Sequence, residues 1–139
     1  MIGVDDRVAM LNDFGRDRVP GMWGLEITSV GPDGAEGGLT VTPPLMSGTG
    51  YVWAPVVVGL ADILCAYAMD LPEGTSFTTI EIKTNFLASA TVGERIVGRS
   101  WPVHRGRTTQ VWDAQVTNET TGKTMALFRN TQLILPPRR

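Results

Sequence analysis

Two hydrophobic periods alternate along this 139-residue chain, one typical of helices and one typical of strands. Residues 4–14 place apolar side chains at helical spacing with acidic residues in the first turn, which predicts a helix that ends before Pro20. Residues 23–30 and 37–42 alternate apolar and polar positions on either side of a turn rich in glycine and proline. This second pattern predicts a β-hairpin after the helix.

The middle of the chain carries its longest apolar run. Residues 55–69 are predicted to form a helix that begins at Pro55, because proline is favoured at the first helical position, where its missing N–H is not needed. Four strand candidates follow, with turns short enough to make them antiparallel neighbours: 77–87, 94–104, 108–118 and 123–135. Pro102, inside the second of these, predicts a sheet edge or a bulge at its position.

The order of elements is a short helix, two strands, one long apolar helix and four strands, without repeats or low-complexity linkers. This order predicts an α+β fold with a mostly antiparallel sheet. The chain has the size of one domain, which we expect to include an N-terminal helical segment over residues 1–20 and a frayed tail over residues 136–139.

The composition narrows the classes of function. A formal net charge of -2, with the charges scattered along the chain, gives no basic surface for nucleic acid or for a membrane. One cysteine and one histidine exclude an internal disulfide and a zinc-type ligand set. Residues 52–69 are slightly too few for a membrane helix and include a charge, and the N-terminus does not resemble a secretory signal. We therefore expect a cytoplasmic protein without a metal or redox cofactor.

The predicted helix over residues 55–69 is apolar on nearly every side rather than along one stripe. Such a helix must be covered from more than one direction. Because only six strands are predicted, we expect a curved sheet that wraps around the helix and a second copy of the chain that covers what remains. The pattern therefore favours a homodimer.

Asp62 is the only charged residue in this apolar run. An ionised carboxylate that is removed from water costs several kcal/mol unless other groups compensate it. Two interpretations stay open. Either backbone or hydroxyl donors satisfy a purely structural carboxylate, or the charge is kept in an apolar cleft as a base or nucleophile, where burial tends to raise its pKa.

Two segments, YVWAPVVVGLAD (51–62) and TTIEIKTNFLASATVGE (78–94), resemble the PaaI-like family of hot-dog acyl-CoA thioesterases. The family pattern N-x-x-G-x-x-H-G-G-x6-[DE] runs into the central helix and places its carboxylate on Asp62. The resemblance implies a hot-dog fold, in which a curved antiparallel sheet wraps around a long central helix. It also implies active sites at the interface of a homodimer, or of a tetramer of two dimers, that hydrolyse an acyl-CoA thioester.

In that family the carboxylate attacks the thioester or activates the attacking water, and coenzyme A enters only as part of the substrate. The chain departs from the family pattern before the helix: Ser47 replaces Asn, Trp53 replaces His, and Ala54-Pro55 replaces Gly-Gly, while Gly50 is retained. The N–H of Ala54 is expected to survive as the oxyanion donor, whereas Pro55 has none. Ser47 is expected beside the water, and Trp53 either lines an aromatic slot for the acyl group or plugs the pocket.

A hydroxyl residue that helps to hold the water in relatives falls on Thr79. Strict alternation along TTIEIKTNF predicts that Thr79 shares a face of its strand with the polar residues Glu81, Lys83 and Asn85. A threonine that only favours strand formation is the alternative to a catalytic role.

Coenzyme A carries phosphate groups that need cationic partners. Lys83, Arg105 and Arg107 are the candidates, and the alternative is that they are solvated basic residues. Two other functions also stay open: a hot-dog protein that only binds acyl thioesters or another apolar ligand, and an enzyme that acts on acyl-carrier-protein thioesters.

Overall fold

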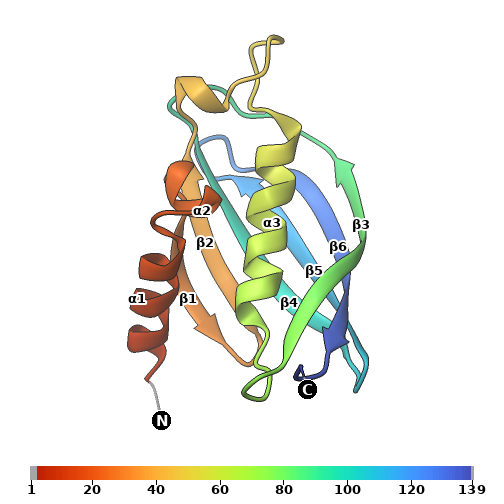
Figure 1. Cartoon of the computed structure of the whole chain (residues 1–139). Helices are drawn as coiled ribbons and strands as arrows, with labels where there is room; N and C mark the ends of the chain where they lie inside the picture. The colour runs from red at the N-terminus through yellow and green to blue at the C-terminus, as the bar shows by residue number, and fades with distance from the viewer. Residues whose placement is uncertain (1–2, 139) are drawn as a thin grey trace.

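The computed structural model describes residues 3–138, which form one six-stranded sheet with helices on one face (Figure 1). The strands are β1 (Glu26–Gly31), β2 (Gly34–Thr40), β3 (Ser76–Phe86), β4 (Arg95–Arg105), β5 (Thr109–Asn118) and β6 (Lys123–Leu135). The helices are α1 (Val4–Gly15), α2 (Val19–Met22), the single-turn 3-10 helix η1 (Pro43–Leu45) and α3 (Ala54–Ala68). All strand pairs are antiparallel, in the order β1-β2-β4-β5-β6-β3, which confirms the predicted α+β fold.

The central helix α3 lies across the concave face of the sheet, over β2, β4 and β5 (Figure 1). It begins at Ala54, one residue earlier than predicted, so that Pro55 takes the second helical position. Leu60 and Leu64 are fully buried between the helix and the sheet. Burial of each such side chain contributes about 1.5–3 kcal/mol, so this contact is the main part of the core.

Two glycines let α3 approach the sheet closely. Gly37 of β2 is paired with Gly98 of β4 beneath the helix. A Cβ at Gly98 would lie 2.6 Å from Cδ1 of Leu64, and one at Gly37 would lie 3.2 Å from its Cδ2. The hydroxyl of Ser100, on β4, also donates to the carbonyl of Leu64 at 2.9 Å. The absent side chains therefore form a notch that holds the middle of the helix.

The hairpin strands are β1 (Glu26–Gly31) and β2 (Gly34–Thr40) instead of the predicted 23–30 and 37–42, so the turn between them is shorter than predicted. The sequence predicts a loop as far as residue 36, because glycine is common in turns. In the structure only Pro32 and Asp33 separate the strands, and β2 already begins at Gly34. Gly34, Gly37 and Gly38 are therefore strand residues, and Gly37 is the one that lies beneath the helix.

The helices α1 and α2 cover one side of α3 and one edge of the sheet (Figure 1). The amide of Asn12 in α1 donates to the carbonyl of Ile27 at 2.9 Å and accepts from its N–H at 2.8 Å, which satisfies edge groups of β1. Trp23, directly after α2, lies against Gly59 of α3, where an added Cβ would come within 2.5 Å of the indole ring.

Pro102 lies next to a bulge, as predicted. The register of β4 against β5 shifts between Pro102 and His104. The pairing of β4 with β2 already ends at Arg99, so the missing N–H of Pro102 breaks no ladder on that side.

Within residues 3–138, every helix is too short or too polar to reach across a bilayer. Residues 136–138 follow β6 without regular structure, and Arg139 of the predicted tail lies outside the described residues.

The last turn of α3 contains no basic residue of its own. Instead, the guanidinium of Arg7 in α1 donates to the carbonyls of Tyr67 and Met69, at 3.1 and 3.4 Å. A cation at this end also interacts favourably with the helix dipole. Arg7 therefore ties the N-terminal helix to the end of the central helix.

We expect Arg7→Ala to lower the free energy of unfolding by about 1–2 kcal/mol, because charged hydrogen bonds to helix-terminal carbonyls are lost. Chemical denaturation of the two proteins measures this difference. Arg16→Ala is the matched control, since Arg16 directly follows the same helix in an exposed pair with Asp13 and should change stability by less than about 0.5 kcal/mol. Equal effects of the two substitutions would contradict the capping role.

Candidate active site

Asp62 occupies the third turn of α3 and is half-buried. Asn130, on β6, donates a hydrogen bond from Nδ2 to Oδ1 of this carboxylate at 2.9 Å. The side chain of Asn130 is completely buried. The helix and the sheet thus hold one oxygen of the carboxylate between them.

Burial raises the pKa of Asp62, and the hydrogen bond from Asn130 acts in the opposite direction. The second oxygen, Oδ2, accepts no hydrogen bond from the described residues and is not sealed from solvent. A carboxylate with a raised pKa, one fixed oxygen and one free oxygen can accept a proton or attack an electrophile.

The strand β3 lies beyond the part of the sheet that α3 covers (Figure 1). Ile82 is paired with Asn130, and Phe86 with Ala126, so both side chains belong to the concave face on which Asp62 lies. Ile82 is 45% exposed and Phe86 is 50% exposed. The carboxylate therefore lies beside an apolar strip that no other part of residues 3–138 covers.

A β-bulge at Ile80 determines which side chains of β3 belong to this strip. Thr79 is paired with Gln132 and Glu81 with Thr131, so Ile80 is an extra residue. Thr79 consequently lies on the concave face, while Glu81 and the alternate polar residues after it lie on the convex face. The predicted shared face of Thr79 with Glu81, Lys83 and Asn85 is wrong, because the alternation breaks at the bulge.

The hydroxyl of Thr79 does not point freely toward a reacting group. Its Oγ1 donates to Oε1 of Gln132 at 3.0 Å, and Gln132 is completely buried. Thr79 is therefore on the same face as Asp62 but is bound to another side chain.

The start of α3 leaves one N–H available. The N–H of Val56 bonds to the carbonyl of Trp53, and Pro55 has no N–H. The N–H of Ala54 has no acceptor among residues 3–138. This single donor, at the positive end of the helix dipole, can bind a developing oxyanion.

The loop before α3 holds Ser47 in local hydrogen bonds. Its Oγ lies 2.6 Å from Oγ1 of Thr49 and donates to the carbonyl of Tyr51 at 3.0 Å. Gly50 has a φ of 89°, a conformation that favours glycine, which accounts for glycine at this turn. Trp53 is 54% exposed, so within one chain its side chain is not part of the core.

The predicted cationic residues are not brought to Asp62 within the single chain. Lys83 lies on the convex face, on the side of the sheet away from α3. Arg105 lines a hollow beside Ala68, the last residue of α3, and Arg107 is exposed in the turn between β4 and β5. Among residues 3–138, no three His, Cys, Asp or Glu side chains come close enough to hold a metal ion.

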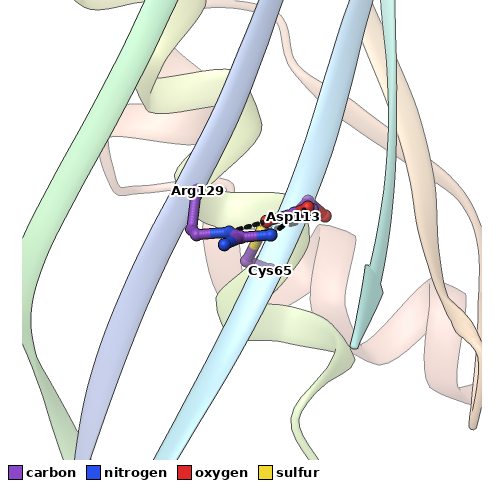
Figure 2. A network of polar contacts seen from close by, with 3 residues as sticks. All are labelled: Cys65, Asp113 and Arg129. Carbon is purple, nitrogen blue, oxygen red and sulfur yellow. Dashed lines mark hydrogen bonds and ion pairs between the residues drawn. The ribbon is translucent and has the colours of Figure 1, made fainter. Parts of the chain in front are cut away.

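Cys65, one turn after Asp62, is not a second nucleophile. It is completely buried, and its Sγ lies 3.8 Å from the backbone carbonyl of Asp113 on β5 (Figure 2). Burial, with the nearby carboxylates of Asp62 and Asp113, raises the pKa of its thiol, so the thiolate is not formed. The carboxylate of Asp113 instead pairs with Arg129 in two contacts of 2.6 and 3.0 Å.

Sequence reasoning missed Asn130 and Gln132. In β6 these amides occupy the inward positions that apolar side chains fill elsewhere in the strand, such as Phe128. Polar residues at inward positions of an alternating strand were the available signal, of the same kind as Asp62 in its apolar helix.

Comparison with known proteins agrees with this geometry. Residues 49–125 match the family model described as the thioesterase superfamily. Rv1847 of Mycobacterium tuberculosis, which is named an esterase, is 33% identical over 102 residues, 70% of this chain and 72% of that protein. A 1,4-dihydroxy-2-naphthoyl-CoA hydrolase of Listeria monocytogenes is 32% identical over 99 residues, 70% of this chain and 80% of that protein.

A solved structure shares this fold. The PaaI protein of the E. coli phenylacetic acid degradation operon superimposes with a TM-score of 0.82 at 23% identity, over 97% of this chain and 98% of that one. The matched segment of the family model contains the start of α3, Asp62 and β3. The chain therefore belongs to the thioesterase superfamily, as a thioester hydrolase whose hot-dog fold is like that of PaaI.

Proposed function

We propose that the protein hydrolyses an acyl-CoA thioester, with Asp62 as its general base or nucleophile. The observation that carries the proposal is the half-buried Asp62 carboxylate, which has one oxygen fixed by Asn130 and the other free beside the uncovered apolar strip of β3. The name of the Listeria relative, a hydrolase of a CoA thioester, supports the choice of coenzyme A as the thiol.

In the proposed reaction a water oxygen, or the carboxylate first, attacks the thioester carbonyl. As a base, Asp62 takes a proton from the water, the carbon–sulfur bond breaks, and this proton passes to the leaving thiolate, which gives a free acid and a thiol. As a nucleophile, Asp62 forms an acyl anhydride as the thiolate leaves, and water then hydrolyses the anhydride to the free acid. The negative charge that develops on the carbonyl oxygen is stabilised by the N–H of Ala54. The apolar strip with Ile82 and Phe86 accepts the acyl chain.

These groups cannot act together within one chain. Ala54 and Asp62 are eight residues apart on the same helix, a separation of about 12 Å along its axis. A reacting carbonyl requires both groups within about 3 Å of its atoms. We therefore assign Asp62 of one protomer and Ala54 of the partner subunit to the same site.

The two edges of the sheet support a dimer through β3. At the β1 edge, Asn12 satisfies the backbone of Ile27, and α1 lies along the strand. At the opposite edge the eleven residues of β3 bond only to β6. A long exposed edge strand favours pairing with another strand. A second β3, related by a two-fold axis, pairs antiparallel with this edge and covers the apolar strip.

We expect Asp62→Asn to lower kcat by about 10²- to 10⁴-fold, because the amide cannot accept the proton. The measurement is release of free CoA thiol from a panel of aromatic and aliphatic acyl-CoA substrates. Cys65→Ser is the matched control on the same helix, and it should keep most of the turnover. An Asp62→Asn protein that retains most of its rate would remove Asp62 from the mechanism, and a folded wild type that only binds acyl-CoA would contradict the hydrolase.

The pKa of Asp62 also predicts how stability depends on pH. Burial raises this pKa above that of an exposed aspartate, so the folded protein binds the proton more readily than the unfolded chain. The free-energy cost of the buried charge is complete above the folded pKa and absent below the pKa of the unfolded chain. Asp62→Asn should therefore raise the melting temperature at pH 7 by about 2–5 °C, and this gain should shrink as the pH falls.

Thermal unfolding at several pH values measures this difference. Asp13→Asn is the control, because Asp13 is an exposed carboxylate on α1. A lower melting temperature for Asp62→Asn at pH 7 would mean that the carboxylate stabilises the fold instead.

Mixing two inactive variants tests the shared site. Ala54→Pro removes the proposed oxyanion donor at a helical position that tolerates proline, after a residue that is already extended. When Ala54→Pro and Asp62→Asn chains are co-expressed equally, half of the dimers are mixed and each of these has one intact site. We expect recovery of about a quarter of the wild-type activity. Dimers that form but stay inactive would contradict a site built from two subunits.

A further inference from the structure

Three buried side-chain atoms among residues 3–138 have no hydrogen-bond partner, and one of them belongs to Asn130, which bonds to Asp62. They are Oδ1 of Asn130, Nε2 of Gln132 and Oγ1 of Thr84. The side chains of Asn130 and Gln132 are both completely buried. Buried polar atoms are nearly always satisfied, and an unsatisfied pair of amides in a core requires an explanation.

The two amides lie side by side on one face of β6. They are two residues apart in the strand, so both point to the concave side, and their Cα atoms are separated by about 6.5–7 Å. Asn130 is paired with Ile82, and Gln132 with Thr79. Thr84 lies on the same face of β3, two positions beyond Ile82.

Each of the two amides already makes one hydrogen bond, Gln132 with Thr79 and Asn130 with Asp62. Thr79 Oγ1 donates to Gln132 Oε1 at 3.0 Å, which leaves Nε2 of Gln132 as an unused donor. Asn130 Nδ2 donates to Asp62 Oδ1 at 2.9 Å, which leaves Oδ1 of Asn130 as an unused acceptor. A donor and an acceptor are thus left on neighbouring inward side chains of β6. One water molecule in the gap between these two side chains would satisfy both. Thr84 does not belong to this pair, because its partner Phe128 is four residues from Gln132 in β6.

We infer that Asn130 is a positioning residue for Asp62, and that an ordered water between Asn130 Oδ1 and Gln132 Nε2 completes a relay of hydrogen bonds from Thr79 to the carboxylate. In this relay each group donates toward Asp62: Thr79 to Gln132, Gln132 to water, water to Asn130, and Asn130 to the carboxylate. Hydrogen bonds in such a chain polarise and strengthen one another. The inference rests on the proposed role of Asp62 in hydrolysis.

The relay has two effects on the carboxylate. It fixes Oδ1, so that Oδ2 is the oxygen that faces the substrate. It also stabilises the ionised form, which burial alone disfavours, because charge-assisted hydrogen bonds are stronger than neutral ones. The hydrogen bond from Asn130 therefore favours the ionised base although the side chain of Asp62 is half-buried.

No charged side chain of the neighbouring strands competes for this role within the described residues. The side chains of β5 on the concave face are Gln110, Trp112, Ala114 and Val116. The charged residues Glu81, Lys83, Asp113 and Arg129 lie on the convex face. On α3 itself the nearest titratable group is Cys65, whose thiol is kept neutral by burial.

The test is the pH dependence of kcat/KM for Asn130→Leu beside the wild type. Loss of the Asn130 donor should move the acid limb of the profile to higher pH, because the ionised form of Asp62 loses a stabilising hydrogen bond and its pKa rises. We expect kcat near neutral pH to fall by about 10- to 100-fold while KM changes little. Gln132→Leu should move the limb in the same direction by a smaller amount.

A purely structural role of Asn130 makes a different prediction. It would lower the melting temperature but leave the acid limb in place. Phe128→Leu is the matched control, because Phe128 is a buried apolar residue on the same face of β6. This variant should lose stability without a shift of the limb. If Asn130→Leu does not fold, Asn130→Ser, whose shorter side chain cannot reach Asp62, takes its place.

A second readout separates this inference from the proposed function. Carbon-13 NMR titration of the Asp62 carboxyl group measures its pKa without turnover, and the pKa should be higher in Asn130→Leu than in the wild type. Asp62-dependent hydrolysis with an unmoved pKa would overturn the relay and leave the function standing. A wild type without any hydrolysis would overturn the function, and the NMR shift would then still decide whether Asn130 governs the carboxylate. A high-resolution crystal structure without ordered water in the gap would overturn the water link.

Discussion

The central constraint on this fold is that α3 is apolar on nearly all sides and must be covered on all of them. The sheet covers one side, and it does so closely because Gly37 and Gly98 leave space for Leu64. The helices α1 and α2 cover a second side, with Trp23 against Gly59. One flank remains, toward β3, and the carboxylate of this helix is on that flank.

That placement reconciles a buried charge with a stable core. A carboxylate facing the notch would need several compensating donors in a region packed with leucine. On the open flank, Asp62 needs only Asn130 for one oxygen, and the other oxygen stays accessible to solvent. The same flank presents an apolar wall to an acyl chain. The flank of α3 that the fold leaves uncovered therefore serves two purposes: it spares Asp62 full burial, and it leaves space for a substrate.

Much of this arrangement follows from local patterns in the sequence. The strands and the long helix were predicted from hydrophobic periods, and Asp62 from its contrast with apolar neighbours. The role of Gly37 and Gly98 could not be predicted, because the reason for these glycines is a tertiary contact that appears only when the helix is in place. Asn130 has no local signal beyond its inward position, since its partner is 68 residues away along the chain.

The bulge at Ile80 gives β3 two possible inner surfaces within one sequence. With the bulge, Ile82 and Thr84 face the helix side and the wall is neutral. If Ile80 instead paired regularly with Thr131, and the first half of the strand kept its register, Glu81 and Lys83 would turn inward. Loss of the bulge with Ile80 retained is thus an evolutionary route between clefts for apolar and for charged acyl groups. An alignment of relatives that ignores an insertion or deletion at residue 80 will place the side chains that follow on the wrong face of the strand.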